Sequence, residues 1–175
     1  EPKGEFRLSA DSFNPQESKD LLRLLTIGAL CNNAILENER GTWSVRGDPT
    51  EGALVVPAAK AGLERTELAK TYPRVWERPF NSERKRMTTV HLTPEGERLA
   101  FVKGAPEIVL EHCSRIFENG KEKKLTDVRR KEILETNEKL ASDALRVLGM
   151  AYKKLNDTMK EFDEEAVEND LVFVG

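Results

Sequence analysis

YPRVWERPFNSERKRMTTVHLTPEGERLAFVK, residues 72–103, is the segment from which the fold class follows. It contains three stretches rich in β-forming residues, at 72–80, 85–93 and 98–103, and the last two are separated by a Pro-Glu-Gly-Glu turn signal at 94–97. Because no helical pattern interrupts these stretches, they predict an antiparallel meander and not a series of β-α-β units.

Helices and further strands are expected on both sides of this segment. Apolar residues that recur on one face predict helices, and Asp48 and Pro49 suit the start of the second one. The expected helices cover 17–32, 49–61, 64–70, 106–113 and 126–141, and the expected strands cover 5–8, 41–45, 145–152 and 171–174. Asn119-Gly120 predicts the tip of a hairpin between 116–117 and 124–125. The chain, residues 1–175, is therefore expected to be a single α+β domain with a twisted antiparallel β-sheet flanked by helices.

Composition limits the function. The chain has 175 residues, 38% hydrophobic and 34% charged, with a net charge of −3 and a pI near 5.6. This acidic balance argues against a nucleic-acid partner held by phosphate contacts. No apolar run is long enough to span a bilayer, so direct membrane contact is not expected. Cys31 and Cys113 lack metal or disulfide spacing, which predicts reduced thiols and no metal site.

The charge is unevenly distributed along the chain. Basic residues gather in the middle, at Arg74, Arg78, Arg84, Lys85, Arg86, Arg98 and Lys103, whereas the stretch from Glu161 to Asp170 is acidic. A basic centre on an acidic protein suits a small anionic ligand. A solvated charged surface is the alternative explanation of the same pattern.

Two segments of the first half of the chain offer candidate ligand contacts. GDPTEGAL, 47–54, places Glu51 in the first turn of a helix, where it either stabilises the helix dipole or accepts a hydrogen bond from an exocyclic amine. PFNSERKRM, 79–87, places Phe80 before several cations, which suits a stacked base with phosphates. The alternative for this second segment is a core aromatic residue beside edge-strand charges.

Two later segments add basic residues. FVKGAPE, 101–107, ends a strand at Lys103 and follows it with the small residues Gly104 and Ala105, which would let a ligand approach the backbone. A lysine that is simply solvated at the end of its strand is the alternative. ALRVLGMA, 144–151, places Arg146 in an expected apolar strand, where it either faces solvent or pairs with an anion such as phosphate. The chain has no Walker A loop.

Taken together and in this order, the four segments resemble the nucleotide-binding domain of P-type cation-transporting ATPases, specifically the calcium-pump-like type II group. The resemblance extends over nearly the whole chain, and its two ends are similar to the crossings into a neighbouring phosphorylation domain. It implies an ATP-binding domain on the cytoplasmic face of a membrane pump, monomeric when isolated, with Mg-ATP as the ligand in the full pump. Its partners would be an adenine nucleotide and the phosphorylation and actuator domains of the same pump.

The resemblance also implies a role for each matching residue. Phe80 would stack on adenine, Glu51 would lie by the adenine amino group, and Lys103 would line the base pocket with Gly104 and Ala105. The remaining implied contacts are Lys85 and Arg146 to the phosphates and Met87 and Leu148 as apolar wall. Ser82 stands where many calcium pumps have an arginine near the nucleotide, and Arg84 or Arg78 is the expected substitute.

The motifs that are missing restrict the expected activity. The sequence contains no DKTGT, TGES or GDGxND motif, so the aspartate that becomes phosphorylated in such pumps is absent. The domain is therefore expected to bind ATP and present its γ-phosphate without hydrolysing it, and no catalytic residue is assigned. Two other classes stay open, namely a small autonomous phosphotransferase with an unrecognised site and a protein-interaction module that docks through helix 126–141.

Overall fold

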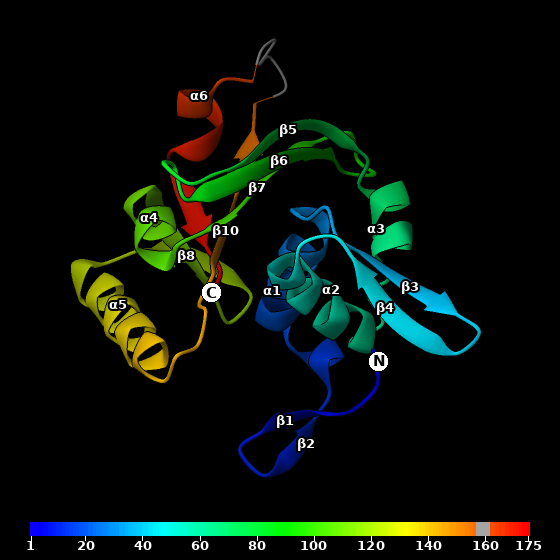
Figure 1. Cartoon of the computed structure of the whole chain (residues 1–175). Coiled ribbons are helices and arrows are strands. Elements are labelled where there is room, and N and C mark those ends of the chain that lie inside the picture. Colours follow the sequence, from blue (N-terminus) through cyan, green and yellow to red (C-terminus); the bar gives the residue numbers. More distant parts are fainter. Residues whose placement is uncertain (157–161) are drawn as a thin grey trace.

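The computed structural model describes residues 1–156 and 162–175, and its centre is a seven-stranded twisted sheet (Figure 1). The strand order is β5 (Arg74–Asn81), β6 (Arg86–Leu92), β7 (Arg98–Gly104), β10 (Gly149–Leu155), β11 (Leu171–Phe173), β8 (Cys113–Glu118) and β9 (Lys121–Lys124). Neighbouring strands are antiparallel except β11 and β8, which are parallel.

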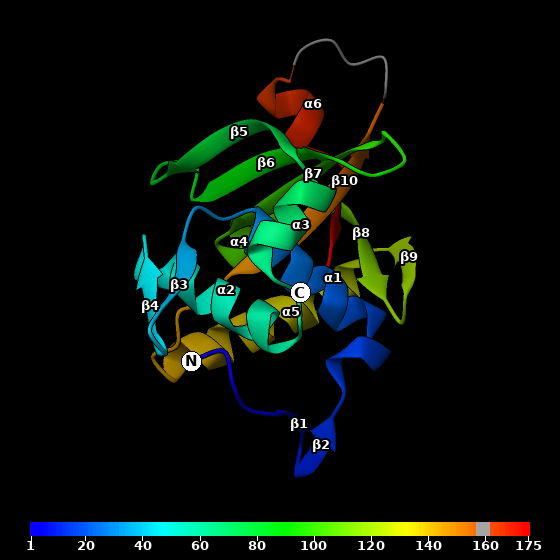
Figure 2. The same ribbon diagram turned by 90° about the vertical axis from the view of Figure 1, so that its right-hand side faces the viewer.

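Helices cover both faces of this sheet (Figures 1 and 2). One face packs against α1 (Lys19–Leu30), which in turn contacts α2 (Pro49–Lys60) and α3 (Arg65–Thr71). The other face packs against α4 (Pro106–Glu111) and α6 (Glu164–Glu168), and α5 (Asp127–Ser142) lies on α4. A short 3-10 helix, Pro15–Glu17, leads into α1. Two hairpins lie apart from the main sheet, β1 (Phe6–Leu8) with β2 (Asp11–Phe13) and β3 (Ile35–Glu39) with β4 (Thr42–Arg46).

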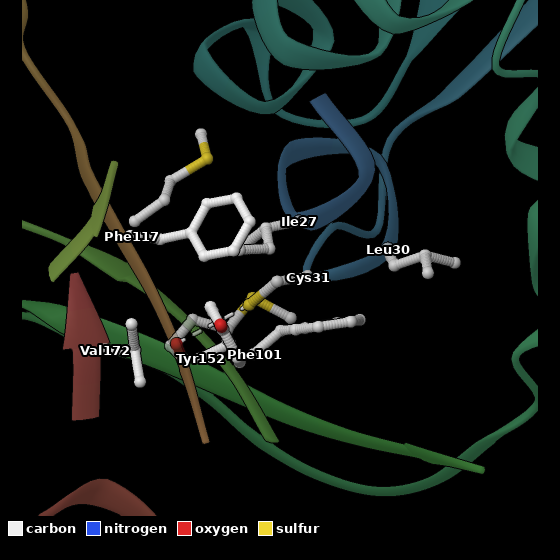
Figure 3. Packing of buried hydrophobic residues seen from close by; sticks show 9 residues of the cluster. Ile27, Leu30, Cys31, Phe101, Phe117, Tyr152 and Val172 are labelled. Atoms are coloured by element: carbon white, nitrogen blue, oxygen red, sulfur yellow. Dashed lines mark hydrogen bonds between the residues drawn. The ribbon is translucent and has the colours of Figure 1, made fainter. Parts of the chain in front are cut away.

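Alternation along β7 shows why both faces are apolar. Phe101 belongs to the core cluster that packs under α1, whereas Ala100 and Val102 belong to clusters on the opposite face. Successive side chains of a strand point to opposite faces, so a strand covered on both sides needs a nearly continuous apolar run. Figure 3 shows the first cluster, in which Ile27 and Cys31 lie above Phe101 and Tyr152.

Most of the expected elements are confirmed. The three consecutive strands are β5, β6 and β7, the Asn119-Gly120 hairpin joins β8 and β9, and Asp48 caps α2. The α+β class with a largely antiparallel twisted sheet is confirmed as well. Within the described residues, no helix combines the length and the apolarity that a membrane span requires.

One expected strand begins later than predicted, and β2, β3 and α6 were not predicted. The strand expected from Leu145 begins only at Gly149, so Arg146 lies in a connecting segment and not in an apolar strand. β3 was not predicted because only its first two residues are apolar, although Arg40 and Gly41 both have positive φ, as a tight two-residue hairpin turn requires. The helix α6 was also missed, and Glu161, at the start of the acidic stretch, lies outside the described residues.

His91 is a buried titratable side chain near the end of β6. It is 1% exposed, with Nδ1 2.9 Å from the Tyr72 carbonyl oxygen and Nε2 2.9 Å from Thr89 Oγ1. A carbonyl can only accept, so Nδ1 donates its proton and Nε2 accepts from the threonine hydroxyl. Burial lowers the pKa of this ring from 6.5 to about 4, only partly offset by the hydrogen bond to Tyr72. His91 is therefore neutral in the folded protein.

We predict that this neutral ring makes stability depend on pH. Since the unfolded chain binds the proton near 6.5 and the folded chain only near 4, the stability present above pH 6.5 is lost as the pH falls through this window. Moving from pH 7.5 to pH 5 should cost about 2 kcal/mol in urea unfolding, and a His91→Gln variant should lose less over the same step. A His91 ring resonance that titrates near pH 6.5 in NMR would contradict the assignment.

Candidate functional site

A cavity of about 500 Å³ opens between the start of α2, the ends of β5 to β7 and the segment that precedes β10. Its lining comes from four parts of the chain that are far apart in sequence. The lining residues are Asp48, Thr50, Glu51, Phe80, Lys85, Lys103, Gly104, Ala105, Arg146, Val147 and Leu148.

An ion pair between the buried Lys103 and the partly buried Glu51 lines this cavity. The Lys103 side chain is only 7% exposed, and its Nζ donates to Glu51 Oε1 at 2.5 Å. The other carboxylate oxygen, Oε2, accepts from the backbone N–H of Asn33 at 3.0 Å. Glu51 thus holds the lysine in place and still has lone pairs for a further donor, because an ionised carboxylate can accept about four hydrogen bonds.

The mouth of the cavity carries an exposed aromatic ring. Phe80 is 61% exposed, although it lies within β5. Opposite β6, the pairing shifts between Arg78 and Asn81, so that β5 has one more residue than its partner over this interval. Such a bulge reverses the alternation, and Pro79, which has no N–H to donate, fits an irregular edge position. The bulge is the local feature that turns Phe80 toward the face with Glu51 and Lys103.

Two cations lie at the same mouth. Lys85 is exposed and has a left-handed backbone (φ 51°), while its carbonyl accepts from Ala105 N at 3.0 Å. Arg146 is also exposed, and its Nη1 donates to Thr50 Oγ1 at 2.9 Å. Asp48 brings a negative charge nearby; hydrogen bonds from the backbone N–H groups of Glu51 and Thr50 lower the pKa of its carboxyl. The Lys103 and Glu51 charges therefore compensate each other, whereas the cations Lys85 and Arg146 are exposed at the rim of the cavity.

Gly104 is required by strand packing in addition to any ligand. A Cβ at this position would lie 2.4 Å from the Lys85 carbonyl oxygen and 2.7 Å from Arg86 Cβ. No side chain fits at such distances, since the contacting atoms include backbone. From the sequence, we expected a glycine here because a ligand approaches the backbone. The close approach of β6 to β7 is a second reason for a glycine at this position.

Eight of the ten residues predicted from the sequence line the cavity, and Ser82 and Met87 do not. Ser82 lies in the exposed turn between β5 and β6. Met87 pairs with Lys103 across the two strands, but its side chain is 1% exposed and packs with the core cluster under α1. Three lining residues were not predicted: Asp48, Thr50 and Val147. Each lies in one of the four segments singled out in the sequence, so those segments could have identified them.

The central arginines are engaged elsewhere. Arg78 and Arg84, the expected substitutes for an arginine at position 82, form ion pairs with Glu164 of α6 at 2.7 and 3.0 Å. The basic middle and the acidic end of the sequence therefore neutralise each other in part, and neither arginine lines the cavity. The positive charge at the cavity comes from Lys85, Lys103 and Arg146.

The two cysteine thiols do not line the cavity. Burial raises the pKa of Cys31 to about 11 and that of Cys113 to about 12, so both stay protonated. Across residues 1–156 and 162–175, no group of three or more His, Cys, Asp or Glu side chains is placed to hold a metal ion.

A second hollow of about 380 Å³ lies behind the segment Val147–Leu148, which lines both. Its wall includes Ile116, Phe117, Ile133 and Phe173. The charged groups at its edge are bonded within the fold; for example, Asp20 accepts from the backbone of Asn119 at 2.7 Å and Arg129 donates to Glu118 at 2.7 Å. The first cavity is the better candidate because it combines an aromatic ring with exposed cations.

Comparison with known proteins points to one family. The family model described as P-type ATPase, cytoplasmic domain N, matches residues 20–175. A calcium-transporting ATPase of Bacillus subtilis is 36% identical over 175 residues, which is 100% of this chain and 20% of that protein. Calcium-transporting ATPase 1 of Lactococcus lactis is 37% identical over 94% of this chain and 19% of its own length. Cation-transporting ATPase pma1 of Synechocystis is 36% identical over 99% of this chain, again 19% of its own length. The chain thus spans about a fifth of the relatives it matches.

We predict strong coupling between the two residues of the inner ion pair. Glu51→Gln leaves the buried Lys103 ammonium without its counter-charge, which should destabilise the fold by about 2–4 kcal/mol in urea unfolding. Adding Lys103→Met removes the orphaned charge, so the double variant should regain part of that loss. Strictly additive effects in this double-mutant cycle would show that the two side chains do not interact.

Proposed function

Since this chain belongs to the P-type ATPase cytoplasmic domain N family, whose members bind nucleotide, we propose that it binds ATP through the adenine and presents the γ-phosphate to the phosphorylation domain of a cation-transporting pump. The observation that carries the proposal is the convergence of an exposed aromatic ring, a buried Lys–Glu pair and two exposed cations on one cavity. This is the combination that a purine with a polyphosphate tail requires.

The base would lie between Phe80 at the mouth of the cavity and the Glu51–Lys103 ion pair. Phe80 offers a stacking face at the mouth, and stacking of a base on an aromatic ring contributes about 1–3 kcal/mol. Glu51 has unused lone pairs for the exocyclic amine of adenine, and Leu148 adds an apolar wall. A guanine has a carbonyl where adenine has this amine, so the proposal includes a preference for adenine over guanine.

The phosphates would lie at the rim. Lys85 and Arg146 are exposed there, and the planar guanidinium of Arg146 suits two phosphate oxygens at once. Because both cations are screened by solvent, the phosphates should add modestly to affinity. We expect a dissociation constant of about 0.1–1 mM, equivalent to roughly 4–6 kcal/mol, and little loss on removing the γ-phosphate.

The role of this chain in the reaction would be positioning. Its residues hold the nucleotide and orient the terminal phosphate, while the acceptor aspartate belongs to another part of the pump. We also propose that the chain lies on the cytoplasmic face of the membrane, works with the phosphorylation and actuator domains of the same pump and uses Mg-ATP; the description of the matching family as a cytoplasmic domain supports this. Taken alone, it should bind ATP without turning it over, and isothermal titration with ATP, AMP and GTP beside a phosphate-release assay tests this directly.

We predict that Phe80→Ala weakens ATP binding about 5- to 10-fold, the lower end of the range that a loss of about 1–3 kcal/mol of stacking gives, because the ring is mostly exposed. Stability should hardly change, since the ring is mostly exposed. Val75→Ala is the matched control, because Val75 is exposed on the same strand but does not line the cavity. This variant should bind ATP with the affinity of the wild type. Equal affinities for all three proteins would exclude Phe80 from the site.

A further inference from the structure

The turn between β5 and β6 is tied to α6 by a network of charged side chains. Arg84 Nε donates to Glu164 Oε1 at 3.0 Å, and its Nη2 donates to Glu168. Arg86 Nε donates to Glu168 Oε2 at 2.5 Å and its Nη2 donates to Glu164 Oε1 at 2.8 Å. Thr88 Oγ1 adds a third donor to Glu168 at 2.6 Å. Two carboxylates of one helix thus hold Arg84 of this turn and Arg86 at the start of β6.

Glu168 is the buried centre of the network. Its side chain is 0% exposed. Burial alone would raise the pKa of this carboxyl, but the hydrogen bonds from Arg84, Thr88 and Arg86 lower it overall, so the group is ionised. An ionised carboxylate in this position is stable only while its donors stay in place, and the arginines are fixed for the same reason.

The two arginines flank a residue of the cavity. Lys85 stands between them in sequence and has a left-handed backbone, which is uncommon for a residue other than glycine. Such a conformation persists where the surroundings fix it. Here Lys85 N donates to Asn81 O at 2.7 Å, Lys85 O accepts from Ala105 N at 3.0 Å, and α6 holds the residue on each side.

We propose that Glu168 is a positioning residue for the nucleotide site, acting through Arg84 and Arg86 on Lys85 of the β5–β6 turn and on the end of β5 with Phe80. This inference rests on the proposed function. Glu168 itself does not line the cavity: Thr88, which binds it, faces α6, whereas the neighbouring Met87 faces α1. Its effect on a ligand would therefore be indirect, through the conformation of the turn. The acidic end of the chain thereby acquires a role in nucleotide affinity.

The test compares Glu168→Gln with Glu165→Gln, a matched loss of charge at an exposed position of the same helix. ATP affinity is measured by isothermal titration, the fold by urea unfolding, and the turn by the amide resonances of residues 80–86. We expect Glu168→Gln to weaken ATP binding about 3- to 10-fold and to shift or broaden the resonances of the turn, while the resonances of Glu51 and Lys103 stay in place. Glu165→Gln should match the wild type in every measurement.

A purely structural role for Glu168 would give lower stability with unchanged ATP affinity, and that result would overturn the proposal. Should Glu168→Gln not fold, Thr88→Val removes only one hydrogen bond of the network; about 2-fold weaker ATP binding then supports the proposal and unchanged affinity overturns it. Absence of ATP binding by the wild type would contradict the proposed function, and with it the premise of this inference. Wild-type binding that is unaffected in the variants would contradict the inference alone.

Discussion

The antiparallel pairing of β6 with β7 up to Arg86 and Gly104 is the constraint on which the candidate site depends. At this point the backbones approach so closely that a Cβ on Gly104 would lie 2.4 Å from the Lys85 carbonyl. The start of β6 and the end of β7 therefore lie side by side, and Lys85 of the β5–β6 turn contacts Ala105, which precedes α4. Lys103, at the end of β7, faces α2 and finds its counter-charge in Glu51. Without this register, the aromatic ring and the lysine would not share a cavity.

Charge is distributed on the two faces of the sheet in different ways. On the face with α1 and α2, the Lys103–Glu51 pair is buried and the exposed cations gather at the rim of the cavity. On the face with α6, Glu164 and Glu168 hold three arginines of β5, β6 and their turn. Buried ion pairs bring little net stability compared with apolar packing, but breaking one is costly, so they fix a geometry. The Lys103–Glu51 pair therefore fixes the geometry of the cavity wall, and the ion pairs of Glu164 and Glu168 fix the β5–β6 turn at its edge.

Much of this arrangement was predictable from local patterns. The three consecutive strands, the helix after Asp48 and the Asn-Gly hairpin depend on residues close together in the chain, and the structure confirms them. The grouping of eight residues on one cavity followed from the order of four segments. Two expectations that differ from the structure depend on long-range geometry: the interior position of Met87 follows from strand register, and the pairing of Arg84 depends on a helix that lies 80 residues away along the chain. Phe80 lines the cavity as expected, but the bulge that directs it there is not readable from the sequence.

The position of the adenine ring in bound ATP tests most directly whether the first cavity is the nucleotide site. Isotope-filtered NOE spectra of the labelled protein with unlabelled ATP measure which side-chain protons are close to adenine H2 and H8. If the base lies in the first cavity, we expect NOEs to the ring of Phe80 and to the side chains of Lys103 and Leu148. NOEs instead to Ile116, Phe117 and Ile133, which line the second hollow, would place the base on the other side of Val147–Leu148 and contradict the account.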